Sequence, residues 1–394
     1  MEELDKVTTL EELSKAISSL PNNKATAERM VADNGIIFDS VKKYYGKELQ
    51  KTEDCKVQSC PKSKMSMEKH IIEAMGMVHE QVSTRQYGCG LVIPEKLEGM
   101  HVLDLGSGSG RDCFALSKLV GKNGFVTGID MTDEQLKVAR DYIDYHTEKF
   151  GYSTPNVKFI QGYIERLTEA GIPEDSQDII VSNCVMCLCP DKKSMLKEAY
   201  KVMKVGGELY FSDMYADRTV PECVQYDEVL WGEGLAGALY WKDLYSLAEE
   251  IGFSRPRLIT ASPMLVDQED FKQKLGDIKY ASVTYRLFKL PKERQPVKHV
   301  VYLGGIMGFP DHFKFDHKNI FKTSTAVSVD EELSTILSSS RFADEFDFQP
   351  VSKQDDCCCF IEAVEVNPFQ YIANKEDKEE TLIQSCSSQV QNCC

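Results

Sequence analysis

The chain has 394 residues, of which 42% are hydrophobic and 27% are charged, a composition typical of a globular protein with more than one domain. No stretch approaches the ~18 uninterrupted apolar residues of a membrane-spanning helix, and the acidic start MEELDKVTTL lacks the apolar core of a secretory signal. We therefore expect a cytosolic protein without membrane contacts. The formal net charge of −16 repels phosphate backbones and disfavours nucleic acid as a partner.

The first part of the chain predicts a polar extension followed by helices. Residues 1–34 are polar, and apolar residues then recur at helical spacing from Ile36 to Leu49 and from Ser66 to Val82. From His101 onward, short apolar runs alternate with helical stretches. The predicted strands are His101–Leu105, Phe125–Asp130, Val157–Ile160, Asp178–Ser182 and Glu208–Asp213, and the predicted helices are Asp112–Val120, Asp133–Phe150 and Lys192–Met203. This alternation is typical of an α/β fold in which helices cover both faces of a mostly parallel sheet.

The second half of the chain predicts the end of this sheet and a smaller unit. A helix over Trp241–Ile251 and strands over Arg257–Thr260 and Ser282–Leu290 complete the sheet, and the alternation in the last of these predicts an antiparallel edge strand. A proline-containing linker follows. We therefore divide the chain into an extension (1–34), a main domain (35–290), a small α+β module (297–350) and a cysteine-rich acidic tail (351–394).

A glycine-rich loop follows the first predicted strand. Asp104 and Leu105 lead into Gly106-Ser107-Gly108-Ser109-Gly110, and a helix begins at once. Glycines are needed where the backbone turns sharply and lets a ligand approach closely. A dinucleotide fingerprint would need glycine at position 111, where this chain has Arg111. The spacing suits a nucleotide-type cofactor without a pyrophosphate. A simple tight turn would explain the loop alone, and the acids at the following strand ends favour the cofactor.

Acidic and polar residues stand at the ends of the following strands. Asp130 and Met131 end the second strand, and a carboxylate there accepts hydrogen bonds from ribose hydroxyls. Gly162, Ile164 and Glu165 follow the third strand and offer an apolar wall and an acceptor for an adenine amino group. Asn183 ends the fourth strand at the same edge of the sheet.

Fourteen cysteines are many for a protein of the reducing cytosol. Several flank the glycine loop or follow the fourth strand, among them Cys89, Cys113 and the cluster Cys184, Cys187 and Cys189. Reduced thiols grouped around a cofactor loop indicate chemistry on a soft element or redox work. Cys184 follows the fourth strand directly.

The motifs together resemble a known family. The segment Asp104–Gly110 with Asp130 and Gly162–Glu165 is similar to class I methyltransferases that bind S-adenosylmethionine and have a Rossmann-like fold. Arg85–Gly90, Gly110–Cys113, Val181–Cys184 and Trp231–Trp241 also resemble the animal-type arsenite methyltransferases. The resemblance extends from about Tyr44 to Leu290.

The resemblance implies a function and a set of site residues. It implies methyl transfer from S-adenosylmethionine to thiol-bound trivalent arsenic, with arsenite and methylated arsenicals as substrates and glutathione or a thioredoxin-type protein as reductant. It assigns arsenic binding to Cys89 and Cys184, and a disulfide relay to Cys60 with Cys89. The residues expected at the cofactor are Tyr87, Asp104, Gly106, Ser107, Gly108, Gly110, Asp130, Met131, Gly162, Ile164, Glu165 and Asn183.

One position departs from the family pattern. Family members read Trp-Gly-Glu-Cys-Leu where this chain has Gly234 between Glu233 and Leu235, so one expected arsenic-binding thiol is missing. Our hypothesis is that Cys187, Cys189, Cys223 or a glutathione thiol replaces it; alternatively, each of these cysteines is a buried small hydrophobe. The substitution also keeps open a methyltransferase for another soft acceptor, such as a thiol or selenol, or a non-catalytic thiol protein that binds arsenite. The segment from about 214 to 290 is expected to bind the substrate.

Overall fold

The computed structural model describes residues 35–49, 67–84, 91–350 and 365–375. Its centre is a sheet of eight strands in which the order β3-β2-β1-β4-β5-β8-β7 is joined by a short β6 beside β5. The strands are β1 (His101–Leu105), β2 (Phe125–Asp130), β3 (Val157–Gln161), β4 (Gln177–Asn183), β5 (Met203–Ala216), β6 (Leu239–Tyr240), β7 (Arg257–Met264) and β8 (Tyr280–Phe288). β1 lies between β2 and β4 and is parallel to both, so the order in which successive strands are added reverses at β1.

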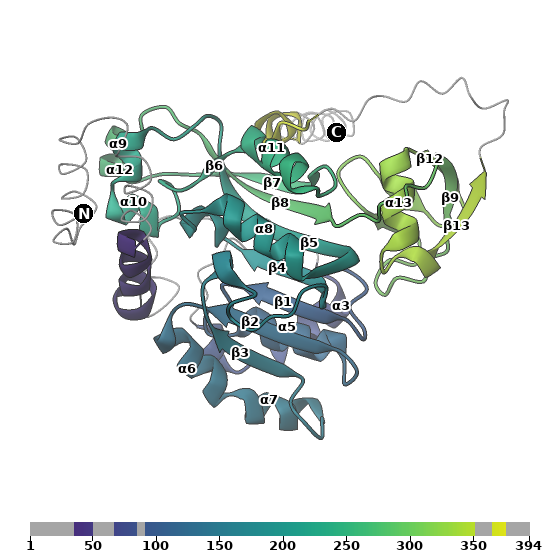
Figure 1. The fold of residues 1–394 in the computed structure, drawn as a ribbon, viewed down its shortest axis with the longest axis horizontal. Helices are drawn as coiled ribbons and strands as arrows, with labels where there is room; N and C mark the ends of the chain where they lie inside the picture. Colours follow the sequence, from purple (N-terminus) through teal and green to yellow (C-terminus); the bar gives the residue numbers. More distant parts are fainter. Residues whose placement is uncertain (1–34, 50–66, 85–90, 351–364, 376–394) are drawn as a thin grey trace, which may run out of the picture.

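Helices cover both faces of this sheet (Figure 1). The helices along the sheet are α3 (Lys69–Gly76), α4 (Glu80–Ser83), α5 (Arg111–Val120), α6 (Asp133–Asp141), α7 (Ile143–Phe150), α8 (Lys192–Val202) and α11 (Trp241–Ile251). Three further helices, α9 (Glu222–Gln225), α10 (Glu228–Gly232) and α12 (Glu269–Leu275), lie together beyond one end of the sheet (Figure 1). Alternate residues of β1 enter different cores: Leu103 packs with α8 and α11, and Val102 packs with α5. None of the described helices is long and apolar enough to cross a bilayer.

The predicted α/β fold is confirmed, with three differences in detail. β8 is antiparallel as predicted but is not an edge strand, because it pairs with both β5 and β7. Nearly all of its residues are buried, whereas β7 alternates between buried and half-exposed positions and forms the edge. The helix predicted over 66–82 is interrupted between α3 and α4, and the helix predicted over 133–150 is interrupted at Tyr142.

A small β-rich module follows the sheet and stands beside it (Figure 1). It contains β9 (Lys298–Tyr302), β10 (His312–Lys314), β11 (Ile320–Lys322), β12 (Ala326–Val329), α13 (Glu331–Ser339), a 3-10 turn η6 (Ala343–Glu345) and β13 (Phe346–Pro350). α13 lies against both β5 and β9. Asp330 caps this helix by accepting a hydrogen bond from the backbone N–H of Leu333 at 2.7 Å.

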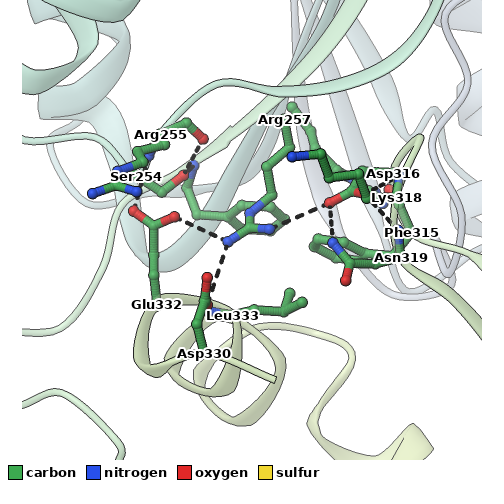
Figure 2. Close-up of polar contacts among 12 residues, drawn as sticks. Ser254, Arg255, Arg257, Phe315, Asp316, Lys318, Asn319, Asp330, Glu332 and Leu333 are labelled. Carbon is green, nitrogen blue, oxygen red and sulfur yellow. Dashed lines mark hydrogen bonds and ion pairs between the residues drawn. The ribbon is translucent and has the colours of Figure 1, made fainter. Parts of the chain in front are cut away.

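Charged side chains join the module to the edge strand β7. Figure 2 shows the guanidinium of Arg257 between Asp316 and Glu332, with N–O distances of 3.3 and 2.9 Å. The backbone N–H of Arg255 also donates to Glu332, at 3.0 Å. Because Arg257 is largely buried, these contacts fix the module at one position on the sheet.

Two segments far from the sheet in sequence also pack onto it. Residues 35–43 form a helix that continues into a π-helical turn, η2 (Tyr44–Glu48). Residues 368–375 form a helix near α11, and the hydroxyl of Tyr245 accepts a hydrogen bond from the backbone N–H of Val366 at 3.0 Å. Part of the predicted tail therefore contributes to the main core, where Ile372 is buried.

Candidate functional site

The glycine loop joins β1 to α5 and leaves an open space above it. Gly106 has a φ of +68° and Gly108 a φ of +52°, values that favour glycine. A Cβ at position 106 would stand 2.5 Å from Cγ2 of Val185, so a side chain there would collide with the loop after β4. A Cβ at position 108 would meet nothing within 4 Å, which leaves the backbone accessible to a ligand.

Gly110 ends the glycine loop at a closely packed position. It does not line the cavity above the loop. It precedes α5 with a φ of +87°, and a Cβ there would stand 2.7 Å from the ring of Phe159. Glycine is needed at this position because α5 packs closely on the sheet, and the predicted contact of Gly110 with the cofactor stays a prediction.

Carboxylates surround the loop. Asp130 accepts hydrogen bonds from the backbone N–H groups of Gly108 at 2.9 Å and Thr132 at 2.8 Å, which fixes its position at the end of β2. Asp104 lies beneath the loop and accepts a hydrogen bond from the thiol of Cys113 at 3.1 Å. Burial and the neighbouring charges of Asp112 and Asp130 raise the pKa of Asp104 to about 8. This concentration of carboxylates favours a positively charged ligand.

The ends of β3 and β4 complete the same edge. Glu165 accepts a hydrogen bond from the thiol of Cys189 at 2.9 Å, and burial raises the pKa of its carboxyl group. Asn183 donates to Asp112 at 3.2 Å. The four strand ends therefore converge because β1 to β4 are parallel and adjacent.

The structure brings most of the predicted cofactor residues to one cavity. The predicted residues that line it are Asp104, Gly106, Ser107, Gly108, Asp130, Met131, Gly162, Ile164, Glu165 and Asn183. Cys184 lines the same cavity. Tyr87, Cys60 and Cys89, which were also predicted as site residues, lie outside the described residues.

Sequence analysis missed several residues of this cavity. Phe38, Val41 and Tyr45 line it from the N-terminal helix, and Asp112 lines it from the start of α5. The helix is held over the cavity by contacts with Tyr163, whose ring lies 4.7 Å from that of Phe38 and whose hydroxyl accepts a hydrogen bond from Lys42 at 2.6 Å. Asp112 could have been noticed from its position next to the glycine loop, whereas nothing in the sequence of the helix indicates this contact.

The loop that carries Cys184 is anchored by a buried carboxylate on β5. Asp213 accepts hydrogen bonds from the backbone N–H groups of Val185 at 3.1 Å, Met186 at 2.8 Å and Cys187 at 3.1 Å. Cys184 has a φ of +55°, an unusual conformation for a residue with a side chain. Backbone strain of this kind is found at functional sites when the surroundings hold it in place.

The described cysteines are in different chemical states. Cys184 is disulfide-bonded, whereas Cys113, Cys187, Cys189 and Cys223 are free thiols. Burial raises the pKa of Cys187 and Cys189 well above the usual range of a thiol. The described residues contain no group of three or more His, Cys, Asp or Glu side chains placed to hold a metal ion.

These observations fit S-adenosylmethionine, the cofactor that the fold implies. Oγ of Ser107 is buried and has no hydrogen-bond partner among the described residues, although Ser107 lines the cavity. Such an atom needs a polar partner, which a ligand would supply. The surrounding carboxylates match a sulfonium cation, and the open space at Gly108 admits the ligand to the backbone.

Comparison with known proteins agrees with the fold and the site. A methyltransferase domain model matches residues 96–252, and the model of the arsenite methyltransferase C-terminal domain matches residues 295–394. The arsenite methyltransferase of Rattus norvegicus is 52% identical over 316 residues, which span 80% of this chain and 86% of that protein. The human arsenite methyltransferase is 46% identical over 365 residues, which span 91% of this chain and 96% of that protein.

A solved structure is also similar. The crystal structure of an arsenic(III) S-adenosylmethionine methyltransferase from Chlamydomonas reinhardtii has a TM-score of 0.69 and 39% sequence identity, and the match covers 73% of this chain and 97% of that chain. Sequence identity at this level over most of both chains, together with the glycine loop and the strand-end carboxylates, establishes the relationship. The chain belongs to the arsenite methyltransferase family.

Proposed function

We propose that this protein transfers methyl groups from S-adenosylmethionine to thiol-bound trivalent arsenic. The observation that carries the proposal is that Cys184 lines the same cavity as the strand-end carboxylates. Family members from the rat, the human and Chlamydomonas reinhardtii, which are described as methyltransferases for arsenite or arsenic(III), support the choice of substrate.

Different residues of the cavity bind different parts of the cofactor. Asp130 offers carboxylate oxygens to the ribose hydroxyls, and Ile164 and Glu165 offer an apolar wall and an acceptor for the adenine. Asp104 and Asp112 favour the positive charge of the bound cofactor. When bound, S-adenosylmethionine supplies an activated methyl group on a sulfonium.

The thiols hold and position the substrate. Arsenic(III) is soft and prefers thiolate ligands to carboxylates or imidazoles. Its lone pair carries no proton, so the attack needs no general base, and the protein acts by positioning arsenic at about 3–3.5 Å from the methyl carbon. The N-terminal helix over the cavity limits the access of water.

A disulfide relay completes the proposed cycle. Transfer of a methyl cation formally oxidises arsenic from the trivalent to the pentavalent state, and two thiols that close to a disulfide return two electrons to it. We assign this relay to Cys60, Cys89 and Cys184, with glutathione or a thioredoxin-type protein reducing the disulfide afterwards. The disulfide bond of Cys184 supports its place in the relay, and the need for a thiol reductant supports the cytosol as the compartment.

An assay of the purified protein with arsenite, reductant and methyl-labelled S-adenosylmethionine tests the proposal. We expect label in methylated arsenicals, and a loss of about 100-fold or more for Cys184→Ser with little change in cofactor affinity, because the serine hydroxyl is a poor ligand for arsenic. Full activity in Cys184→Ser would contradict this proposal.

Gly234 stands where a cysteine is expected, and this substitution favours a second candidate function. In that function the protein is a methyltransferase for another soft acceptor, such as a thiol or selenol. Label in such acceptors, with none in arsenicals, would support that candidate. Arsenite binding without any turnover would instead indicate a non-catalytic binding protein.

A further inference from the structure

Two loops pack closely beside the cavity. One follows β4 and contains Cys184 and the 3-10 turn η5 (Met186–Leu188). The other, residues 231–238, begins with the last two residues of α10 and continues beyond it. Nε1 of Trp231 donates a hydrogen bond to the carbonyl oxygen of Leu188 at 3.2 Å. A Cβ at Gly237 would stand 1.9 Å from the carbonyl oxygen of Cys187, so only glycine permits this contact. The backbones of the two loops are therefore fixed against each other.

Gly234 faces the thiol of Cys187 across this contact. A Cβ at position 234 would stand 2.9 Å from Sγ of Cys187 and 3.2 Å from Cε of Met214. Carbon and sulfur atoms of well-packed side chains do not approach so closely without a shift of one of them. The thiol of Cys187 therefore takes up space that a side chain at position 234 would need.

The other two candidate thiols lie in different surroundings. Cys189 donates its hydrogen bond to Glu165 and lines the cofactor cavity, and Cys223 is exposed in α9. Cys187 is buried among Met214, Trp231 and Leu235, and its thiol is hydrogen-bonded to the carboxylate of Asp213. Cys184 packs against the same cluster. Cys187 is thus the candidate thiol that combines contact with position 234 and proximity to Cys184.

We propose that Cys187 supplies the arsenic-binding thiol that Gly234 lacks, so that the sulfur ligand has moved from the loop of residues 231–238 to the loop of Cys184. This inference rests on the proposed function, since it concerns how the same substrate is bound. In the binding step an As–O bond of arsenite and the S–H bond of Cys187 break, an As–S bond forms, and the hydroxide leaves with the thiol proton as water. No electrons are transferred in this exchange.

The test is the number of sulfur atoms around arsenic in the reduced protein, measured by X-ray absorption spectroscopy after addition of arsenite. Cys187→Ala is expected to lower this number by one and to weaken arsenite binding about 100-fold, because one arm of a multidentate site is lost. Cofactor affinity and the unfolding temperature of each variant are measured alongside, and Cys187→Ser, which keeps the side-chain volume, is the second variant if Cys187→Ala is unstable.

A compensating substitution makes the test specific. Gly234→Cys in the Cys187→Ala background should restore the lost sulfur, since removing Sγ of Cys187 frees the space at position 234. Gly234→Cys alone should lower the unfolding temperature because of the 2.9 Å contact and the left-handed φ of +79° at this position. An unchanged sulfur number in Cys187→Ala, or a loss confined to Cys189→Ala or Cys223→Ala, would overturn the inference. Methyl transfer by the unsubstituted protein reports separately on the proposed function.

Discussion

The carboxyl group of Asp104 is expected to ionise when the cofactor binds. Its side chain is buried beneath the glycine loop, and its pKa of about 8 means that it is mostly protonated near neutral pH when no cation is bound. A sulfonium in the cavity would stabilise the ionised form. Cofactor binding should therefore release a proton from Asp104.

This linkage predicts a pH dependence of cofactor affinity. Between roughly pH 6 and pH 8 the affinity for S-adenosylmethionine should rise with pH, by up to about tenfold per unit, and level off above the pKa of Asp104. Titration calorimetry across this range measures it. Asp104→Asn should remove the rise, whereas Asp133→Asn, which changes an exposed carboxylate near Asp130, should keep it. An identical profile in Asp104→Asn would show that another group titrates.

Cys184 illustrates a second property of single residues at this site. Its left-handed backbone conformation costs roughly 1 kcal/mol or more for a residue with a side chain. The surrounding hydrogen bonds compensate for this strain and hold the residue at the edge of the cavity. The conformation of Cys184 therefore depends on the hydrogen bonds of the whole loop after β4.

At the scale of elements, β5 positions the cysteine loop of β4. The carboxylate of Asp213 is fully buried and accepts hydrogen bonds from the backbone N–H groups of three successive residues of that loop. It also accepts a hydrogen bond from the backbone N–H of Met214 at 2.7 Å. A carboxylate has the lone pairs for these bonds, whereas the amide of asparagine offers one oxygen. The loop therefore depends on a residue that does not line the cavity.

Asp213→Asn should weaken arsenite binding by about tenfold or more and reduce cofactor affinity much less, since the loop moves while the glycine loop stays in place. The unfolding free energy should fall by about 2–4 kcal/mol, because buried N–H groups lose their acceptor. Arsenite titration, cofactor titration and denaturant unfolding measure these effects. Asp217→Asn, which changes a half-buried carboxylate directly after β5, is the matched control, because Asp217 accepts hydrogen bonds from Arg218 and Lys279 and, among the described residues, has none to the cysteine loop. Equal losses of both affinities would argue against a positioning role.

At the scale of the whole molecule, a buried ionic network joins the sheet to the C-terminal module. Arg286 of β8 is fully buried and pairs with Glu208 of β5 and with Glu95, whose carboxylate lies 2.9 Å away. Arg286 also donates to the carbonyl oxygen of Phe315 in the module at 2.8 Å, and Arg341 of the module pairs with Glu208. The carboxylate of Glu208 thus pairs with one arginine of the sheet and one arginine of the C-terminal module.

Glu208→Gln should therefore destabilise the protein by about 3–5 kcal/mol, because it removes the buried carboxylate that Arg286 and Arg341 share and leaves Arg286 with Glu95 alone. Denaturant unfolding followed by circular dichroism measures this change. Asp277→Asn breaks an exposed ion pair with Arg218 and should change stability by less than about 1 kcal/mol. Similar effects of the two substitutions would contradict the assignment of the network.

Local sequence patterns are sufficient to predict the central strands of the fold and many of the residues that line the cavity. β1 and β2 begin and end at the predicted residues, because short apolar runs bounded by glycine and acidic residues are strong local signals. Asp130 and Glu165 were found for the same reason: parallel strands that follow one another along the chain place their ends at one edge of the sheet. The departure at Gly234 was also visible in the sequence.

Contacts between distant segments were decided only by the tertiary structure. The interior position of β8 depends on which strand pairs with its second edge, and the role of Gly110 depends on the ring of Phe159. The placement of residues 38–45 over the cavity and of Sγ of Cys187 beside Gly234 likewise joins segments that are far apart along the chain. By itself the sequence determined the kinds of element and the chemistry available, because these depend on neighbouring residues. Packing decided which side chains meet, because steric fit between distant surfaces leaves no periodic trace in the sequence.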